Sequence, residues 1–166
     1  MAYTQEQLLH YLDAHHITYQ LYTHPQLFTC EQALHIVKEL NMPGQGIKNL
    51  FLKDSKKQLY LVVAVYSTRI DLKRLSKALQ AKDLRFADAA LLMHHLGVEP
   101  GSVTPLALIN DAQHAVHVII DAEVFKQDLI QIHPLKNDAT VVIRPADFDL
   151  FLQSINRSYI VYGFTV

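Results

Sequence analysis

The chain has 166 residues, half of them apolar, which suits a single domain with a buried core. Its formal net charge of −1 argues against a protein that coats DNA or other long nucleic acid. A single cysteine, the lack of an apolar run near the roughly 20 residues of a membrane-spanning helix, and an acidic start unlike a secretion signal predict a cytoplasmic protein without a membrane segment.

Helix and strand signals alternate along the first half of the chain. Capping-box spacing marks helix starts, and β-rich runs that stop at Pro or Gly mark strands. In chain order the predicted elements are a helix from Thr4–Gln7, a strand over 17–23, a helix from Thr29–Gln32 to about Leu40, and a hairpin of strands 47–53 and 58–66.

The second half continues with shorter elements. They are a helix over 71–82, a strand over 84–87, a helix from Asp88 to Gly97, strands over 105–109, 115–121, 129–132 and 139–143, and a helix from Pro145 through Leu152. Because the regular βαβ spacing of a doubly wound sheet is missing, we predict an α+β fold, with a mixed sheet and flanking helices. The domain should span 1–156, and the apolar tail 157–166 should dock on the sheet or on a second copy.

The formal net charge is close to zero, but the central part of the sequence is strongly basic. Residues 48–85 carry ten Lys or Arg against three Asp, a net +7, whereas 1–47 carry −3 and 86–166 carry −5. Such a block attracts a polyanion over a short stretch, although a solvated face with several lysines explains it as well. From charge alone, the exposed side of the 71–82 helix is the candidate contact for such a polyanion, through Lys73, Arg74 and Lys77.

Three polar islands interrupt the apolar sequence. They are Lys48-Asn49 at the start of a buried strand, the loop from Gly101 to Pro105, and the segment from His133 to Asn137. A cation, a carboxamide, loop amides and an imidazole suit the hydrolysis of an activated ester beside a phosphate. Each island also has a structural explanation without a function. Lys48 can be an exposed strand-end lysine, the loop from Gly101 to Pro105 an ordinary turn, and His133 a structural hydrogen-bonding residue.

Two other chemistries find no support in the sequence. Ser102 and Thr104 lie in no G-x-S-x-G elbow and have no obvious base–acid pair, so a serine-hydrolase triad is rejected. The adjacent pairs His15-His16 and His94-His95 lack the spacing of a metal site, and we expect neither a catalytic metal nor a cofactor.

Taken together, the islands resemble one family. The matching stretches, in order over almost the whole chain, include HPQLFTCEQA (24–33), GIKNLFLKD (46–54), LGVEPGSVTPLALIND (96–111) and HPLKNDATVVIRPADFDLFL (133–152). They are similar to the freestanding aminoacyl-tRNA deacylases of the YbaK/ProX type, which are related to the editing domain inserted in many prolyl-tRNA synthetases. The resemblance implies a partly barrel-like mixed sheet and hydrolysis of mischarged tRNA, with alanine on tRNA(Pro) as the expected substrate and prolyl-tRNA synthetase as a further expected partner.

The resemblance also implies roles for individual residues. Lys48 would hold the phosphate and ribose end of the tRNA, and Asn49 would contribute to the aminoacyl site. The loop amides of Gly101, Ser102, Val103 and Thr104 would surround the reacting carbonyl. Pro105 would belong to the same loop, and His133 would border the amino-acid pocket. His24, Asn137 and Thr29 are further predicted substrate contacts, although Thr29 is a helix cap first and a ligand contact second. The basic side chains of Lys73, Arg74 and Lys77 would guide the acceptor stem of the tRNA, a prediction that rests on charge alone.

The sequence leaves the amino acid open. Leu106-Ala107 stand where the family often has Phe-Gly, and Asp138 replaces a commoner small hydroxyl residue, so both positions reshape the expected pocket. Cys, Ser or Thr esters are alternative substrates. A non-catalytic partner of a synthetase, which binds aminoacyl-tRNA or a nucleotide, is the alternative of another class.

Overall fold

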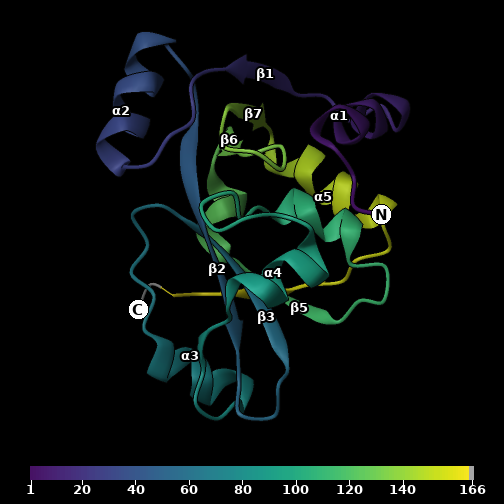
Figure 1. The fold of residues 1–166 in the computed structure, drawn as a ribbon. Helices are drawn as coiled ribbons and strands as arrows, with labels where there is room; N and C mark the ends of the chain where they lie inside the picture. Colours follow the sequence, from purple (N-terminus) through teal and green to yellow (C-terminus); the bar gives the residue numbers. More distant parts are fainter. Residues whose placement is uncertain (165–166) are drawn as a thin grey trace.

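A mixed β-sheet organises the computed structural model, which describes residues 1–164 (Figure 1). Within these residues the strands form one eight-stranded sheet in the order β1-β7-β6-β2-β3-β5-β8, with β4 paired to β2 outside this path. The pairs β2–β6, β3–β5 and β5–β8 are parallel and the others antiparallel. The strands are β1 (Gln20–Thr23), β2 (Gln45–Lys53), β3 (Leu59–Val65), β4 (Arg85–Phe86), β5 (Val116–Asp121), β6 (Ile130–Ile132), β7 (Ala139–Ile143) and β8 (Ile160–Tyr162).

The helices begin where the sequence places their caps. Thr4 and Thr29 each form a complete capping box, and Asp88 caps a helix that Gly97 ends in the left-handed region. The α-helices are α1 (Gln5–Ala14), α2 (Cys30–Glu39), α3 (Leu72–Leu79), α4 (Ala89–Leu96) and α5 (Pro145–Ser154). The α+β class with flanking helices is therefore confirmed.

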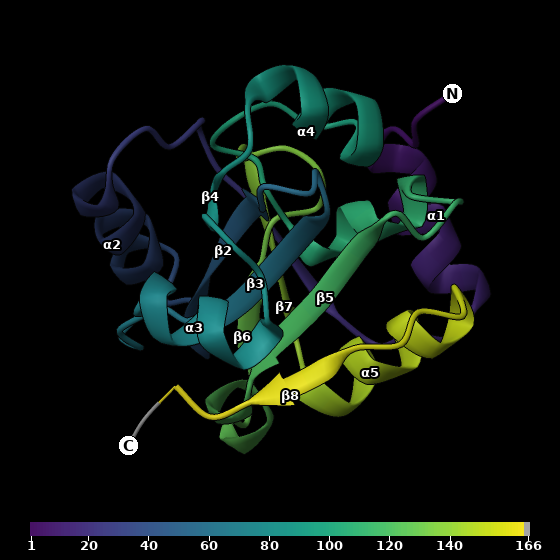
Figure 2. The ribbon, with the colours of Figure 1, turned by 90° about the horizontal axis from the view of Figure 1, so that it is seen from below.

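The two faces of the sheet are covered unequally. On one face, which we call the core face, strand residues such as Phe51 and Leu61 pack with α1, α4 and α5, and Phe148 and Phe151 are fully buried there. On the other, the α3 face, Leu52 and Val62 pack against α3. Figure 2 shows α1 and α5 on one side of the strands and α2 and α3 on the other. The α2 helix has no buried residue.

One predicted strand is wrong. Residues 105–109 form part of a 3-10 helix, η1 (Pro105–Asn110), because Thr104 caps the Leu106 amide and Pro105 has the fixed φ of a helical first turn. The run is apolar because η1 is buried in the core, and periodicity alone cannot separate a short buried helix from a strand. A second 3-10 helix, η2 (Ala122–Lys126), was not predicted.

The C-terminal tail belongs to the same sheet. In β8, Ile160 and Val161 pair with Ile119 and Ile120 of β5, so the tail docks on the edge of the sheet. No helix in residues 1–164 has the length and apolar character needed to span a membrane.

Candidate functional site

Lys48 and Asn49 lie on opposite faces of the sheet. They are successive residues of β2, and strand side chains alternate between the faces. Asn49 shares the core face with Ile47 and Phe51, whereas Lys48 shares the α3 face with Leu50 and Leu52. One cavity on one face therefore cannot hold both side chains, and they can meet a common ligand only at an edge of β2.

Such an edge exists. One side of β2 pairs with β3 along its length, but on its other side it pairs with β6 only at Gln45 and Gly46, and with β4 only at Leu52 and Lys53. Phe51 accepts a bond from the Ala87 amide. Within the described part of the chain, the edge from 47 to 50 has no strand partner on this side. Both predicted residues of the first island lie in this gap.

Asn49 joins this edge to the second island. Its Nδ2 donates to the Val103 carbonyl at 3.1 Å, and so fixes the loop from Gly101 to Pro105 against β2. Its Oδ1 is buried, and among residues 1–164 it has no hydrogen-bond partner. An unpaired buried acceptor costs about 1–3 kcal/mol, so an oxygen left in this state is a candidate contact for a ligand.

The loop offers backbone donors. Gly101 has φ +90°, and a Cβ there would meet nothing within 4 Å, so the chain beside it is open. The Ser102 amide donates to the Glu99 carbonyl and is already used, whereas the amides of Gly101, Val103 and Thr104 have no partner among the described residues. The Thr104 hydroxyl caps η1 and is buried, and Pro105 is buried beside it. The loop can thus act through its amides, whereas the Thr104 hydroxyl is already used within η1.

The third island is tied to the segment after β1. The backbone amide of His24 donates to the Asp138 carbonyl at 3.0 Å. The imidazole Nε2 of His24 lies 2.9 Å from the Thr140 hydroxyl. Its Nδ1 lies 2.8 Å from the Pro25 carbonyl, which can only accept, so Nδ1 donates there and Nε2 faces the Thr140 hydroxyl. Sequence reasoning missed Thr140, although a hydroxyl within the apolar strand ATVVI was a signal.

His133 is held in one tautomer. Its Nδ1 lies 3.2 Å from the Ala139 carbonyl and must donate to it, which leaves Nε2 as an acceptor in the neutral ring. Burial lowers the pKa of His133 below its ordinary value, and the nearby His24 lowers it further against the opposing effect of the Ala139 bond. The imidazole is therefore mainly neutral at pH 7, and among residues 1–164 its Nε2 has no hydrogen-bond partner.

Lys48 lies in β2, and His133 directly follows the neighbouring strand β6. The strands β2 and β6 run parallel and their pairing ends with Gly46 opposite Gln131, so Lys48 and His133 each lie two residues beyond the last pair. The loop is thus bonded to β2 through Asn49, and the His133 segment leaves the sheet next to the unpaired stretch of β2.

The remaining predicted residues have mainly structural contacts. Asn137 is buried and donates to the Leu27 carbonyl at 2.7 Å, which holds the chain leading into α2. Thr29 caps α2 by accepting from the Gln32 amide. Lys73, Arg74 and Lys77 are exposed on α3, whose Leu75 is buried under them.

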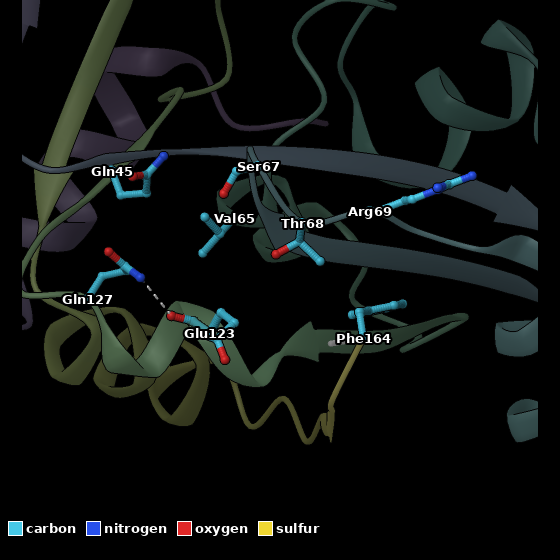
Figure 3. A pocket seen from close by; sticks show the side chains of 8 residues that line it. All are labelled: Gln45, Val65, Ser67, Thr68, Arg69, Glu123, Gln127 and Phe164. Atoms are coloured by element: carbon cyan, nitrogen blue, oxygen red, sulfur yellow. Dashed lines mark hydrogen bonds between the residues drawn. The ribbon is translucent and has the colours of Figure 1, made fainter. Parts of the chain in front are cut away.

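A separate pocket of about 460 Å³ lies near the end of β3 (Figure 3). None of the predicted site residues lines it. Its described lining residues are Gln45, Val65, Ser67, Thr68, Arg69, Glu123, Gln127 and Phe164.

Comparison with known proteins decides the family. The model of the aminoacyl-tRNA editing domain family matches residues 24–151. This chain belongs to that family. The editing domain covers all three islands, and the expected enzyme class, an aminoacyl-tRNA deacylase, is confirmed.

Relatives and a solved structure agree with this assignment. The chain is 38% identical over 143 residues to the prolyl-tRNA synthetase associated domain-containing protein 1 of Danio rerio, covering 85% of this chain and 77% of that one. It is 32% identical over 149 residues to the prolyl-tRNA editing protein ProX of Acetoanaerobium sticklandii, covering 89% and 90%. A crystal structure of a hypothetical protein shares the fold of this editing domain, with a TM-score of 0.71 at 17% identity over 93% and 96% of the chains.

Proposed function

We propose that this editing domain acts in trans on mischarged tRNA(Pro), with Ala-tRNA(Pro) as the preferred substrate. The observation that carries the proposal is the bond from Asn49 to the Val103 carbonyl, which holds the loop against the unpaired stretch of β2 that also contains Lys48. The names of the relatives support prolyl tRNA as the RNA and prolyl-tRNA synthetase as a partner. In this proposal the reaction takes place in the cytoplasm.

The reaction is a hydrolysis. Water adds to the ester carbonyl carbon, the bond from that carbon to the ribose oxygen breaks, and the ribose oxygen takes a proton. An aminoacyl ester is already activated, so positioning and charge stabilisation supply most of the rate. A hydroxyl of the ribose itself activates the water in this proposal, which needs no side-chain base.

Each part of the site has a role in this scheme. The free amides of Gly101, Val103 and Thr104 stabilise the oxyanion, and one preorganised donor is worth about 10²–10³ in rate. The Lys48 ammonium binds the terminal phosphate on the α3 face. The unpaired Asn49 Oδ1 accepts a hydrogen bond from the substrate's ammonium or ribose hydroxyl.

Selectivity for alanine would follow from exclusion of larger side chains. A synthetase gains only about 1–3 kcal/mol per methylene, which is why a second, smaller site is needed. His133, with its ring fixed by Ala139, is the expected wall of that site. Leu106 and Ala107 are fully buried in η1 and shape the loop from beneath.

A panel of tRNAs charged with Ala, Pro, Cys, Ser or Thr tests the proposal. The purified protein should release alanine from tRNA(Pro) fastest and leave Pro-tRNA(Pro) intact, as measured by loss of labelled amino acid from the RNA. The Lys48→Ala variant should lose at least about 10²-fold in rate. Lys53→Ala, a matched change at the far end of the same strand, should stay within about twofold.

Two results would replace the proposal. Faster release of Cys, Ser or Thr would assign the enzyme to another ester, and tight binding of every charged tRNA without release would make it a binding partner of a synthetase.

A further inference from the structure

Tyr66 is an exposed aromatic side chain that is held in place at two points. It directly follows β3, its amide donates to the Gly46 carbonyl at 2.9 Å, and its hydroxyl contacts Cys30 Sγ at 2.6 Å. The residue is nonetheless 48% exposed. The ring is therefore fixed in orientation while part of it stays open to solvent, which is how a stacking platform is built.

The ring lies beside the proposed phosphate site. Tyr66 is opposite Gly46, and Lys48 is opposite Ala64, so Tyr66 and Lys48 are diagonal neighbours on the α3 face. Diagonal pairs lie about 7–8 Å apart, within reach of an aromatic and a lysine side chain. Gly46 places no side chain between them.

From Tyr66 the chain leads directly to a basic surface. Residues 66–82 contain five Lys or Arg against one acid, Asp71, whose carboxylate already caps α3. Arg69 lies in the connection, and the exposed side chains of Lys73, Arg74 and Lys77 follow on α3. Figures 1 and 2 both show this connection running between α2 and α3 on one side of the molecule.

We propose that Tyr66 stacks on a base of the single-stranded 3′ end of RNA, whose backbone continues past Arg69 to the basic side of α3. This rests on the proposed function, which puts the terminal ribose near Lys48. Aromatic stacking tolerates any base and combines with positive charge in proteins that bind single strands. The platform would orient the chain end before the ester reaches the edge of β2.

The absence of tryptophan from the sequence gives a clean test. The Tyr66→Trp variant carries a single indole, whose fluorescence should be quenched on titration with an uncharged single-stranded RNA that ends in CCA. Leu150→Trp is the matched control, because Leu150 is also 48% exposed but lies on α5, across the sheet. Its fluorescence should not change, and anisotropy of labelled RNA reports binding independently.

Substitutions separate stacking from the bond to Cys30. Tyr66→Ala should weaken RNA binding about tenfold, whereas Tyr66→Phe keeps the ring and should bind nearly as well. Equal losses in both variants, or RNA binding that leaves the indole at position 66 unquenched, would overturn the platform.

Deacylation is scored separately. Quenching without deacylation would support RNA stacking on Tyr66 and reject the proposed function. Deacylation with an unquenched indole would support the proposed function and reject stacking on Tyr66.

Discussion

At the scale of single residues, His133 shows how the fold selects one chemical form. The Ala139 carbonyl fixes the proton on Nδ1, and burial disfavours the charged ring. A cation at this position would also repel the ammonium group of an aminoacyl ester. A neutral ring can instead border the substrate as an acceptor, which agrees with a role in shaping the site.

This state predicts a pH dependence with a defined sign. The folded pKa of His133 is lowered, so the unfolded chain takes up this proton more readily. The contribution to folding is therefore complete above the ordinary pKa of about 6.5, and is lost as the pH falls through the lowered value. Urea unfolding at pH 7.5 and 5.5 should show a larger loss for the wild type than for His133→Gln, which keeps an amide donor for Ala139. Equal losses would contradict the assignment, and an NMR titration should place the imidazole midpoint below 6.5.

Some residue-level features follow from the sequence and others do not. The opposite faces of Lys48 and Asn49 follow from strand alternation alone once β2 is predicted. The bond from Asn49 to Val103 joins residues 54 positions apart, and no local pattern encodes it. Thr140 and Tyr66 gain their roles only from neighbours brought by other strands.

At the scale of elements, the predictions that succeeded rest on local chemistry. The caps at Thr4, Thr29 and Asp88 each bond within their own first turn, so four residues of sequence suffice to place them. The strand predicted at 105–109 failed because its apolar run is explained by burial in the core, and burial does not distinguish strand from 3-10 helix.

The α3 helix carries a prediction of its own. If Lys73, Arg74 and Lys77 each neutralise a phosphate, changing all three to Gln should lower the slope of log K against log salt by about 2–3. Filter binding of tRNA at several salt concentrations measures the slope. Lys126→Gln is the control, because Lys126 is an ion-paired lysine on η2, which packs on the core face. An unchanged slope in the triple variant would exclude α3 from the RNA path.

At the scale of the whole molecule, a buried ion pair ties the tail to the domain. Arg157 contacts Asp111 at 2.9 Å and also donates to the Val116 carbonyl at the start of β5. Both charged side chains are buried, and Asp111 accepts from the amides of Ala115 and Val116 as well. The tail after 156 is thus anchored at its first residue, three residues before β8 joins the edge of the sheet.

Loss of one partner should therefore be costly. Arg157→Ala leaves the Asp111 carboxylate buried without its counter-ion, and should lower the free energy of unfolding by about 3–5 kcal/mol. Lys126→Ala breaks a solvent-exposed pair and should have no measurable effect. Thermal and urea unfolding compare the two, and a loss as small for Arg157→Ala as for Lys126→Ala would show that the pair does not hold the tail.

The gap along β2 has a consequence for how such a protein can change over evolutionary time. Every amino acid except proline supplies a backbone N–H, so donors of the main chain survive most substitutions of the residues that carry them. If the loop amides stabilise the reaction as proposed, selection can change the neighbouring side chains, and with them the accepted amino acid, while the catalytic donors are kept.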